Sequence, residues 1–256
     1  MFRPGAFWNG RKHHLDRMTL RDLVHAYFAY PAIQAYLALG TASAVAALWS
    51  GGSVLSLLVA AVAAVLLYPL VWYLLHRFVL HGSFLYKMQW SAALWKRIHF
   101  DHHRDPHDLR VLFGSLANTL PTIIIVTVPL GWAIGERSSA AAALSAGLFT
   151  TCVYEFCHCI QHLAYEPKYA LLKRIKRLHL AHHFHNESGN FGITNFFWDR
   201  VLGTFYAHPR EIPKSATVFN LGYAETAAER WPYVATLTQD WGQPRRPPRR
   251  TGGASA

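Results

Sequence analysis

The sequence predicts an all-α integral membrane protein, with four transmembrane helices in two hairpins and a cytoplasmic helical cap. Composition is the first observation behind this fold class. Of the 256 residues, 52% are hydrophobic and 15% are charged, whereas roughly a quarter are charged in ordinary soluble domains. The mean hydropathy is positive, at +0.11. The second observation is a set of four apolar stretches, each long enough for a helix that crosses a bilayer, which takes about 20 residues.

Two short turns arrange these stretches in pairs. The predicted transmembrane segments are residues 27–49, 54–75, 112–134 and 140–159. Residues 50–53 separate the first two segments, and a short turn at 135–138 lies between the last two. The third segment contains Pro121 and Pro129, which membrane helices tolerate where neighbouring groups satisfy the freed carbonyls. Because short turns leave consecutive helices side by side, we expect two helical hairpins.

The positive charges predict which side each loop faces. Of the 25 lysines and arginines, only Arg137 falls in a turn on the far side of the predicted bundle. The other 24 lie before residue 27, in the segment 76–110, or after residue 162. Basic loops stay on the cytoplasmic side of a membrane. Both termini and the central loop should therefore be cytoplasmic, which in a bacterium means the inner membrane. This topology accounts for the net charge of +11, and we expect no nucleic-acid partner.

Ten of the 16 histidines gather at the cytoplasmic ends of these segments. They form four groups: His76 and His81; His99, His102 and His103; His158 and His162; and His179, His182 and His183. Neutral imidazole is a ligand for iron, zinc and copper. The predicted topology brings all four groups to one face of the membrane, as a shared metal site requires. Ten imidazoles exceed the needs of one ion, so the sequence predicts a dinuclear site with about five nitrogens for each ion.

The spacing within each group suits metal binding to a different degree. Residues four apart lie on one helical face, so His158 and His162 can bind one ion together. In the two groups of three, the imidazoles at i, i+3 and i+4 could all serve one ion or be shared between two. His76 and His81 are five apart, which places them about 140° apart on an ideal helix. We expect the helix to loosen or end between these two residues.

Polar residues near the histidines are candidates to hold the rings in one orientation. The candidates are Asp101, Asp105, Asp108, Glu155, Asn186, Glu187, Asn195 and Asp199, of which Glu155, Asp101, Asn186 and Asp199 are preferred. An acidic residue within a membrane helix needs a partner, so Glu155 is expected to hydrogen-bond a ligand histidine. The alternative for each is an ordinary surface or capping role.

Six histidines are predicted to lie outside the metal site. We expect His13, His14 and His25 to be solvated or interfacial, and His107, His185 and His208 to be solvated or to support the ligands.

The remaining sequence divides the chain into four parts. Residues 1–26 form a basic cytoplasmic segment, and residues 27–208 form the membrane and metal-binding domain. Residues 209–242 form a cytoplasmic segment that we expect to cover the site. The basic, proline-rich end, residues 243–256, has the composition of a disordered tail. Within the second part, apolar residues at spacings of three and four predict a helix over 168–183 at the membrane interface.

Four motifs resemble the membrane fatty acid hydroxylase/sterol desaturase superfamily, and more specifically its fatty acid 2-hydroxylases that act on sphingolipid acyl chains. They are HRFVLH (76–81), HFDHHRDPHDLRVL (99–112), HCIQH (158–162) and HLAHHFHNESGNFGITNFFWDRVLGT (179–204). The resemblance implies that the ten grouped histidines bind two iron ions, although zinc could occupy them in purified protein. It also implies O2 as co-substrate and a lipid acyl chain as substrate. Residues 1–75 lack a His-Pro-Gly-Gly haem motif, so we expect a separate electron donor, either cytochrome b5-like or ferredoxin-like.

Two alternatives stay open on the sequence. A desaturase, or a hydroxylase of sterols or carotenoids, would use the same histidine groups. A non-catalytic metal-binding or transport protein of the membrane is the second alternative. Transporter sites lie near the bilayer midplane, whereas these histidines lie at or beyond the helix ends, which favours an enzyme.

Overall fold

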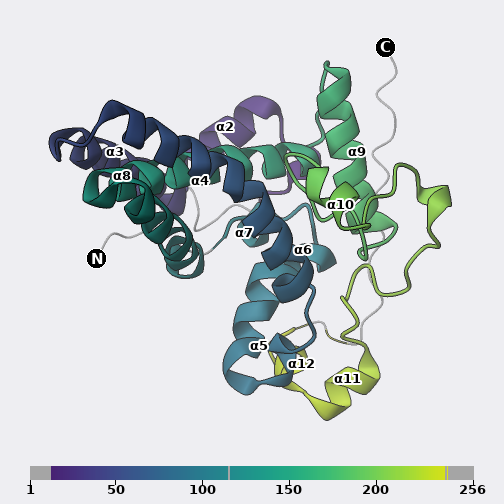
Figure 1. Ribbon diagram of the computed structural model, residues 1–256. Coiled ribbons are helices and arrows are strands. Elements are labelled where there is room, and N and C mark those ends of the chain that lie inside the picture. The colour runs from purple at the N-terminus through teal and green to yellow at the C-terminus, as the bar shows by residue number, and fades with distance from the viewer. Residues whose placement is uncertain (1–12, 115, 240, 242–256) are drawn as a thin grey trace.

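The computed structural model describes residues 13–114, 116–239 and 241, and every regular element among them is helical. In chain order the helices are η1 (Leu15–Arg17), α2 (Leu20–Ala29), α3 (Pro31–Trp49), α4 (Val54–Leu74), η2 (Leu75–Leu80), η3 (Leu85–Lys87), α5 (Gln89–Trp95), η4 (Lys96–Phe100), α6 (Asp101–Arg104), α7 (Leu109–Leu112), α8 (Leu116–His162), α9 (Ala170–Phe184), α10 (Phe197–Val201), η5 (Pro209–Glu211), α11 (Glu225–Arg230) and α12 (Tyr233–Thr236). The long helices α3, α4 and α8 extend to one side, and the shorter helices gather at their other end (Figure 1). The structure therefore has a long apolar bundle and a cap.

The first predicted hairpin consists of α3 and α4. Helix α3 begins at Pro31, later than predicted, because Tyr30 before the proline is extended and separates α3 from α2. The turn between α3 and α4 contains Gly51 at a φ of 72°, a conformation that suits glycine. Ser53 then caps α4 by accepting a hydrogen bond from the backbone N–H of Ser56. The end of α3 and the start of α4 agree with the predicted segments.

Helix α8 carries a single label but is sharply bent in its middle. Gly135 and Glu136 have non-helical backbone angles, with a φ of 56° at Glu136. A Cβ atom on Gly131 would lie 2.3 Å from the carbonyl oxygen of Ser139. Eight residues of straight helix span about 12 Å, so the chain must double back. The predicted turn at 135–138 thus divides α8 into two arms.

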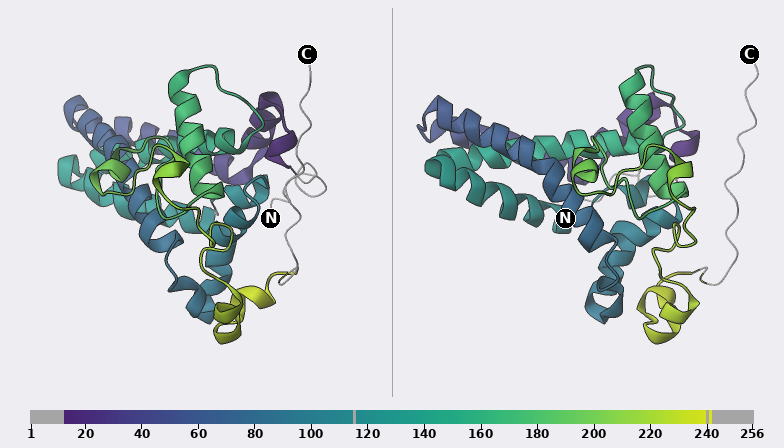
Figure 2. Two further views of the ribbon diagram at one scale, coloured as in Figure 1. Left: turned by 90° about the vertical axis from the view of Figure 1, so that its right-hand side faces the viewer. Right: turned by 45° about the vertical axis from the view of Figure 1, so that its right-hand side comes forward.

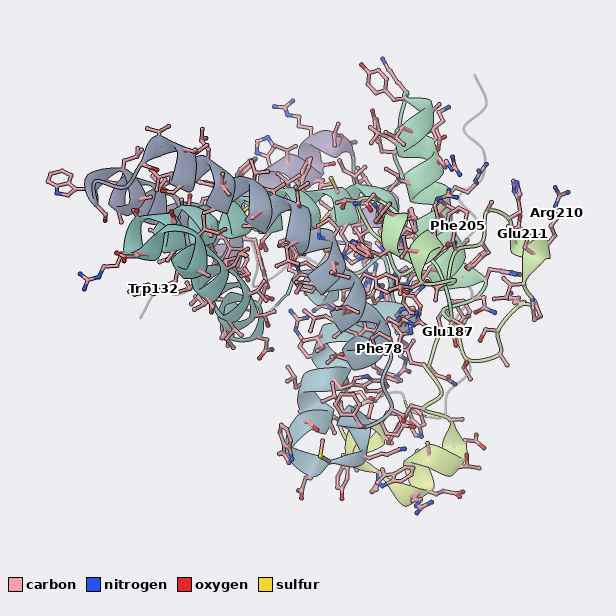
Figure 3. The ribbon with its side chains drawn as sticks, viewed as in Figure 1. Phe78, Trp132, Glu187, Phe205, Arg210 and Glu211 are labelled. Atoms are coloured by element: carbon pink, nitrogen blue, oxygen red, sulfur yellow. The ribbon has the colours of Figure 1, made fainter. Side chains whose placement is uncertain are left out.

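Three stretches are long and apolar enough to cross a membrane: Pro31–Trp49, Val54–Lys87 and Leu109–His162. The last contains both arms of α8. Apolar side chains on α4 face outward, and Leu55 and Leu66 are each about 70% exposed. Trp132 is exposed at the end of the bundle away from the cap (Figure 3), and Trp49, the last residue of α3, is also exposed. Outward leucines with tryptophans at the helix ends are typical of a multi-pass membrane protein.

Small residues and hydroxyls hold the long helices together. The hydroxyl of Ser145 donates to the carbonyl of Gly40 at 2.8 Å, which joins α8 to α3. Tyr68 donates to Thr151 at 3.1 Å, which joins α4 to α8. An alanine cluster lies between the same two helices, where small side chains allow the backbones to approach closely. These contacts fix the direction in which α4 and α8 enter the cap.

The cap is built around an aromatic cluster between its central and C-terminal parts. Tyr86 and Trp95 pack against Tyr223, with ring centroids 5.1 Å apart for Tyr86 and Tyr223. The indole N–H of Trp95 donates to the carbonyl of Leu80, which fixes α5 to the end of η2. Figure 2 shows α11 and α12 beside α5 from two further sides. The C-terminal segment is therefore part of the folded cap.

The N-terminal segment differs from the prediction in one respect. His13 was predicted to be solvated or interfacial, but it is buried. The carbonyl of His13 accepts a hydrogen bond from the backbone N–H of Leu109, and His14 forms an isolated antiparallel bridge with Asp108. Leu15 is buried in the core formed by α2, α3 and α8. The beginning of the described chain thus packs against the loop that follows the second histidine group. The predicted tail at 243–256 lies outside the described residues.

Candidate metal centre

The ten predicted histidines form two groups of five. Cluster A consists of His76, His81, His99, His103 and His182, and cluster B consists of His102, His158, His162, His179 and His183. Within each cluster the candidate ligand nitrogens all lie within 4.8 Å of one another. All ten side chains are buried except His81, which is half-buried. Each cluster therefore offers five imidazole nitrogens to one ion.

The two groups of three histidines are divided between the clusters in the same way. In each, the residues four apart enter one cluster: His99 and His103 enter cluster A, and His179 and His183 enter cluster B. The middle residue goes to the opposite cluster. Each cluster thus combines one of the two groups of two histidines, the i, i+4 pair from one group of three, and the middle histidine of the other group of three. The sequence left this division open, because it depends on how the helices cross.

A π-helical turn explains how His76 and His81 reach the same cluster. The backbone N–H of His81 donates to the carbonyl of His76 at 3.1 Å, an i to i+5 bond within the π-helix η2. In a π-turn residue i+5 lies almost above residue i, and the two ring centroids are 5.0 Å apart. The expected loosening between these residues is therefore an ordered widening of the helix. A second π-helix, η4, carries His99.

Cluster B forms where α9 packs against the end of α8. The Lys176 ammonium donates to the carbonyls of Leu163 and Tyr165, at 2.6 and 2.7 Å, and so ties α9 to the chain that leaves α8. The Nε2 atoms of His162 and His179 are then 2.9 Å apart. Neighbouring ligands at right angles on one ion, each about 2.1 Å from it, would be separated by about 3 Å. The spacing therefore fits a shared ion.

Backbone carbonyls orient three of the rings in cluster A. The Nδ1 atom of His76 lies 2.6 Å from the carbonyl oxygen of Phe191. The corresponding distances are 2.9 Å from His103 to Val218 and 2.8 Å from His182 to Gly189. A carbonyl only accepts hydrogen bonds, so Nδ1 must carry the proton in each ring. The Nε2 atom of each ring is then left with a free lone pair, as a metal ligand requires.

The unpartnered nitrogens test whether the clusters fit a metal ion. In cluster A the Nε2 atoms of His76, His81, His99 and His182 are buried without a hydrogen-bond partner. In cluster B the Nε2 atom of His183 is in the same condition, and the Nε2 atoms of His102 and His158, and of His162 and His179, lie 3.1 and 2.9 Å apart. A buried polar atom without a partner costs about 1–3 kcal/mol. Buried Nε2 atoms gathered in this way fit a divalent ion in each cluster.

The protonation state of the rings agrees with metal binding. Burial lowers the pKa of His99, His102 and His179 well below that of a solvated histidine, and neighbouring imidazoles lower it further. The pKa of His182 and of His183 is lowered for the same reasons. These rings are neutral at physiological pH, which is the form that binds metals.

The four preferred supporting residues have other partners than the rings. Asp101 pairs with Lys96 at 2.7 Å, and Glu155 accepts a bond from the backbone N–H of Gly114 at 3.4 Å. Asn186 donates to the carbonyl of Pro213. The expected bond from Glu155 to a ligand histidine is therefore not formed in the described structure. Rings of cluster A instead contact backbone carbonyls of Gly189, Phe191 and Val218.

Asp199 does support the site, but through the backbone. It is fully buried, and its carboxylate accepts hydrogen bonds from the N–H groups of Phe191 and Gly192, at 2.7 and 2.9 Å, and from the Thr204 hydroxyl at 2.8 Å. These bonds hold the loop whose carbonyl, at Phe191, orients His76. The sequence predicted a bond from Asp199 to a ligand ring, whereas its described bonds go to two backbone N–H groups and a hydroxyl.

The loop that supplies these carbonyls runs close to other backbone. A Cβ atom on Gly189 would lie 2.3 Å from the carbonyl oxygen of Thr204, and one on Gly192 would lie 2.0 Å from that of Asn195. Asn190, between them, has a φ of 56° and is fully buried. Two glycines around an asparagine directly after the last histidine group are typical of a tight loop. This pattern was the signal that could have identified the loop whose carbonyls accept hydrogen bonds from the rings.

The other histidines lie outside both clusters. His107 contacts the carbonyl of His162 through Nδ1 and stacks on Phe184, and His185 contacts the carbonyl of Ile212. His25 and His208 are exposed. None of these four described histidines belongs to cluster A or cluster B.

An apolar cavity of about 390 Å³ reaches both clusters, a size within the usual range of ligand pockets. Its histidines are His76 and His99 of cluster A and His102, His158 and His183 of cluster B. Its wall includes Trp72 and Leu75 from the bundle end and extends along the first arm of α8 as far as Pro121 and Thr122. Pro121 and Ala117 are also exposed on that arm. The cavity thus connects the membrane-facing bundle with the histidines.

Comparison with known proteins agrees with this geometry. Residues 61–204, which include all ten clustered histidines, match the fatty acid hydroxylase family. Over 145 residues the chain is 34% identical to dihydroceramide fatty acyl 2-hydroxylase FAH2 of Arabidopsis thaliana, covering 55% of this chain and 57% of that protein. Over 148 residues it is 31% identical to ceramide very long chain fatty acid hydroxylase SCS7 of Saccharomyces cerevisiae, covering 55% and 36%. The matched region spans about half or less of these relatives.

A solved structure shares the fold as well. The structure of full-length scs7p, in which only the hydroxylase domain is visible, superposes with a TM-score of 0.61 at 28% identity. The match covers 74% of this chain and 69% of that chain. With more than half of its residues matched, including every histidine of clusters A and B, the chain belongs to the fatty acid hydroxylase family.

Proposed function

We propose that the protein is an O2-dependent di-iron enzyme that hydroxylates a lipid acyl chain, at the 2-position of a fatty acid or of a sphingolipid acyl group. One observation carries this proposal: an apolar cavity opens along a membrane-facing arm and ends on histidines of both clusters. Such a cavity fits a hydrocarbon chain whose reacting carbon lies beside the metals. The names of the relatives, fatty acyl and ceramide hydroxylases, support the same substrate class.

The ten histidines would hold the metals, one ion in cluster A and one in cluster B. When bound, the two ions would supply the activation of O2 that allows an unactivated C–H bond to be hydroxylated. We propose iron as the native metal. Zinc binds the same imidazole ligands and lies higher in the Irving–Williams order, so zinc in a purified sample is compatible with this assignment. Electrons would come from a separate donor, cytochrome b5-like or ferredoxin-like.

The cavity would also orient the substrate and exclude water. Hydroxylation at the 2-position places the reacting carbon next to a carboxyl or amide group, so polar atoms are needed near the metals. Tyr154 and Glu155 line the cavity within about one helical turn of His158. Most of the remaining wall is apolar, including Leu75, Val79 and Ile98. The substrate's polar end would then lie near Glu155 and its tail along the first arm of α8.

For the membrane, we propose that α3, α4 and both arms of α8 each cross the bilayer, which makes four crossings in two hairpins. The break at Gly135 and Glu136 supports this count. Arg137, at that break, would be the one basic side chain on the far side, so the cap, the metal centre and both termini would be cytoplasmic. The exposed basic side chains of α9 would then lie near the lipid headgroups.

The product of the reaction separates the alternatives. We expect cells that express the protein together with a reduced donor to accumulate acyl lipids that have gained one oxygen, with the hydroxyl at carbon 2, as measured by tandem mass spectrometry. A desaturase would instead give lipids that have lost two hydrogens, and a sterol or carotenoid hydroxylase would leave the acyl lipids unchanged. Metal uptake with an unchanged lipid profile would contradict the enzyme assignment and favour a binding or transport protein.

Filling the cavity should lower activity without removing metal. Thr122→Trp places a large ring in the cavity wall, and we expect at least a tenfold fall in acyl hydroxylation at unchanged metal content, because the chain can no longer reach the clusters. The matched control is Ile125→Trp on the same arm, where the side chain is exposed and faces away from the protein. Equal activity in the two variants would show that the acyl chain does not use this cavity.

A further inference from the structure

The C-terminal segment reaches cluster A although it lies beyond the family match, which ends at residue 204. We call residues 213–218 the strap. Its last carbonyl, at Val218, lies 2.9 Å from Nδ1 of His103, and Val218 is buried. The backbone N–H of Ser215 donates to the carbonyl of His185, just after α9. The orientation of one candidate ligand thus depends on a segment outside the matched region.

One buried carboxylate fastens the strap. Glu187 follows the last histidine group by four residues, and its Oε1 atom accepts the hydroxyls of Ser215 and Thr217 at 2.9 and 2.5 Å. Its Oε2 atom is buried without a hydrogen-bond partner. All hydrogen bonds described for this side chain therefore go to the strap. Burial of a carboxylate costs free energy, and here the buried carboxylate supplies the two hydrogen bonds that hold the strap.

The geometry points to Glu187 as a positioning residue for the metal centre. We propose that it holds the strap on the segment after α9, so that the Val218 carbonyl keeps the His103 ring with Nε2 directed into cluster A. This inference rests on the proposed function, in which His103 is a metal ligand. Among the described residues, no hydrogen bond joins the strap to a ring of cluster B, so the effect should be confined to one of the two ions.

The inference is tested by metal binding rather than by activity. The full-length chain in detergent is stripped with a chelator and titrated without oxygen with Fe(II) against a competing chelator. We expect Glu187→Ala to weaken binding of one of the two iron ions by about 10–100-fold, the usual cost of removing a group that supports a ligand. Glu187→Gln keeps an acceptor oxygen for both hydroxyls and should bind iron nearly as the wild type does.

The control is Glu211→Ala. Glu211 belongs to the same C-terminal part of the chain, but it is exposed and lies with Arg210 at the outer end of its loop, away from Glu187 (Figure 3). It should bind both ions as the wild type does. If Glu187→Ala does not fold, Ser215→Ala combined with Thr217→Val removes the two donors from the strap itself and should weaken the same single ion.

Three outcomes would overturn the positioning role. They are wild-type binding of both ions by Glu187→Ala, wild-type binding by the double strap variant, and equal weakening by Glu187→Gln and Glu187→Ala. A wild-type chain that binds no iron would instead contradict the proposed function, and the inference with it. The two kinds of failure are therefore distinguished by the wild-type titration.

Discussion

Replacing either His182 or His183 by alanine is expected to lower lipid hydroxylation by at least about 100-fold. The two residues are adjacent in the sequence but belong to different clusters, His182 to cluster A and His183 to cluster B. Loss of a group that merely supports a ligand already costs about 10–100-fold, so loss of a ligand should cost at least as much. Each variant should also retain one iron per chain instead of two, and the ion lost should differ between them.

Iron per chain and hydroxylated product measured on the same preparations check this prediction. His208→Ala is the control, because His208 is exposed and outside both clusters. It should leave both quantities unchanged. If His182→Ala or His183→Ala kept two irons and the wild-type rate, that histidine would not be a ligand. Loss of both ions in each variant would show that the two clusters bind metal as one unit.

The fold could be predicted to the extent that it depends on local sequence. Apolar stretches of sufficient length gave the long helices, and the turn at 135–138 gave the break in α8. The first helix was predicted to start too early because its hydropathy continues into α2, whereas the extended residue before Pro31 separates the two helices. The fold of the C-terminal segment was not predicted in detail. It depends on aromatic contacts between Trp95 and Tyr223, which are far apart in the chain.

The site was predictable in membership but not in arrangement. The ten histidines that enter the two clusters were identified from their spacing and from the predicted topology. The division into clusters did not, because whether His102 faces the same ion as His103 depends on the crossing of helices. The π-turn between His76 and His81 also escaped the prediction, since no local pattern distinguishes it from an α-helix that ends. Every residue has a backbone carbonyl, so the sequence does not single out the carbonyls that orient the rings. Only the folded loop shows which ones do so.

Asp199 holds the loop that carries one of these carbonyls. We expect its replacement to have the second large effect. Asp199→Ala would leave the N–H groups of Phe191 and Gly192 and the Thr204 hydroxyl without their acceptor. Each buried group left unpaired costs about 1–3 kcal/mol, so the free energy of unfolding should fall by about 3 kcal/mol or more. The freed loop would also stop holding the Phe191 carbonyl against His76, and iron in cluster A should bind about 10–100-fold more weakly.

A matched series separates the two effects of Asp199. Asp199→Asn keeps one acceptor oxygen, which can serve Phe191 and Thr204, but its amide nitrogen faces the N–H of Gly192. It should therefore fall between wild type and Asp199→Ala in both thermal unfolding and Fe(II) titration. Glu229→Ala, an exposed change on α11, should match the wild type in both. Normal iron binding by a destabilised Asp199→Ala would mean that the His76 ring is oriented by its packing alone, because the loop and its carbonyl would then be dispensable for cluster A.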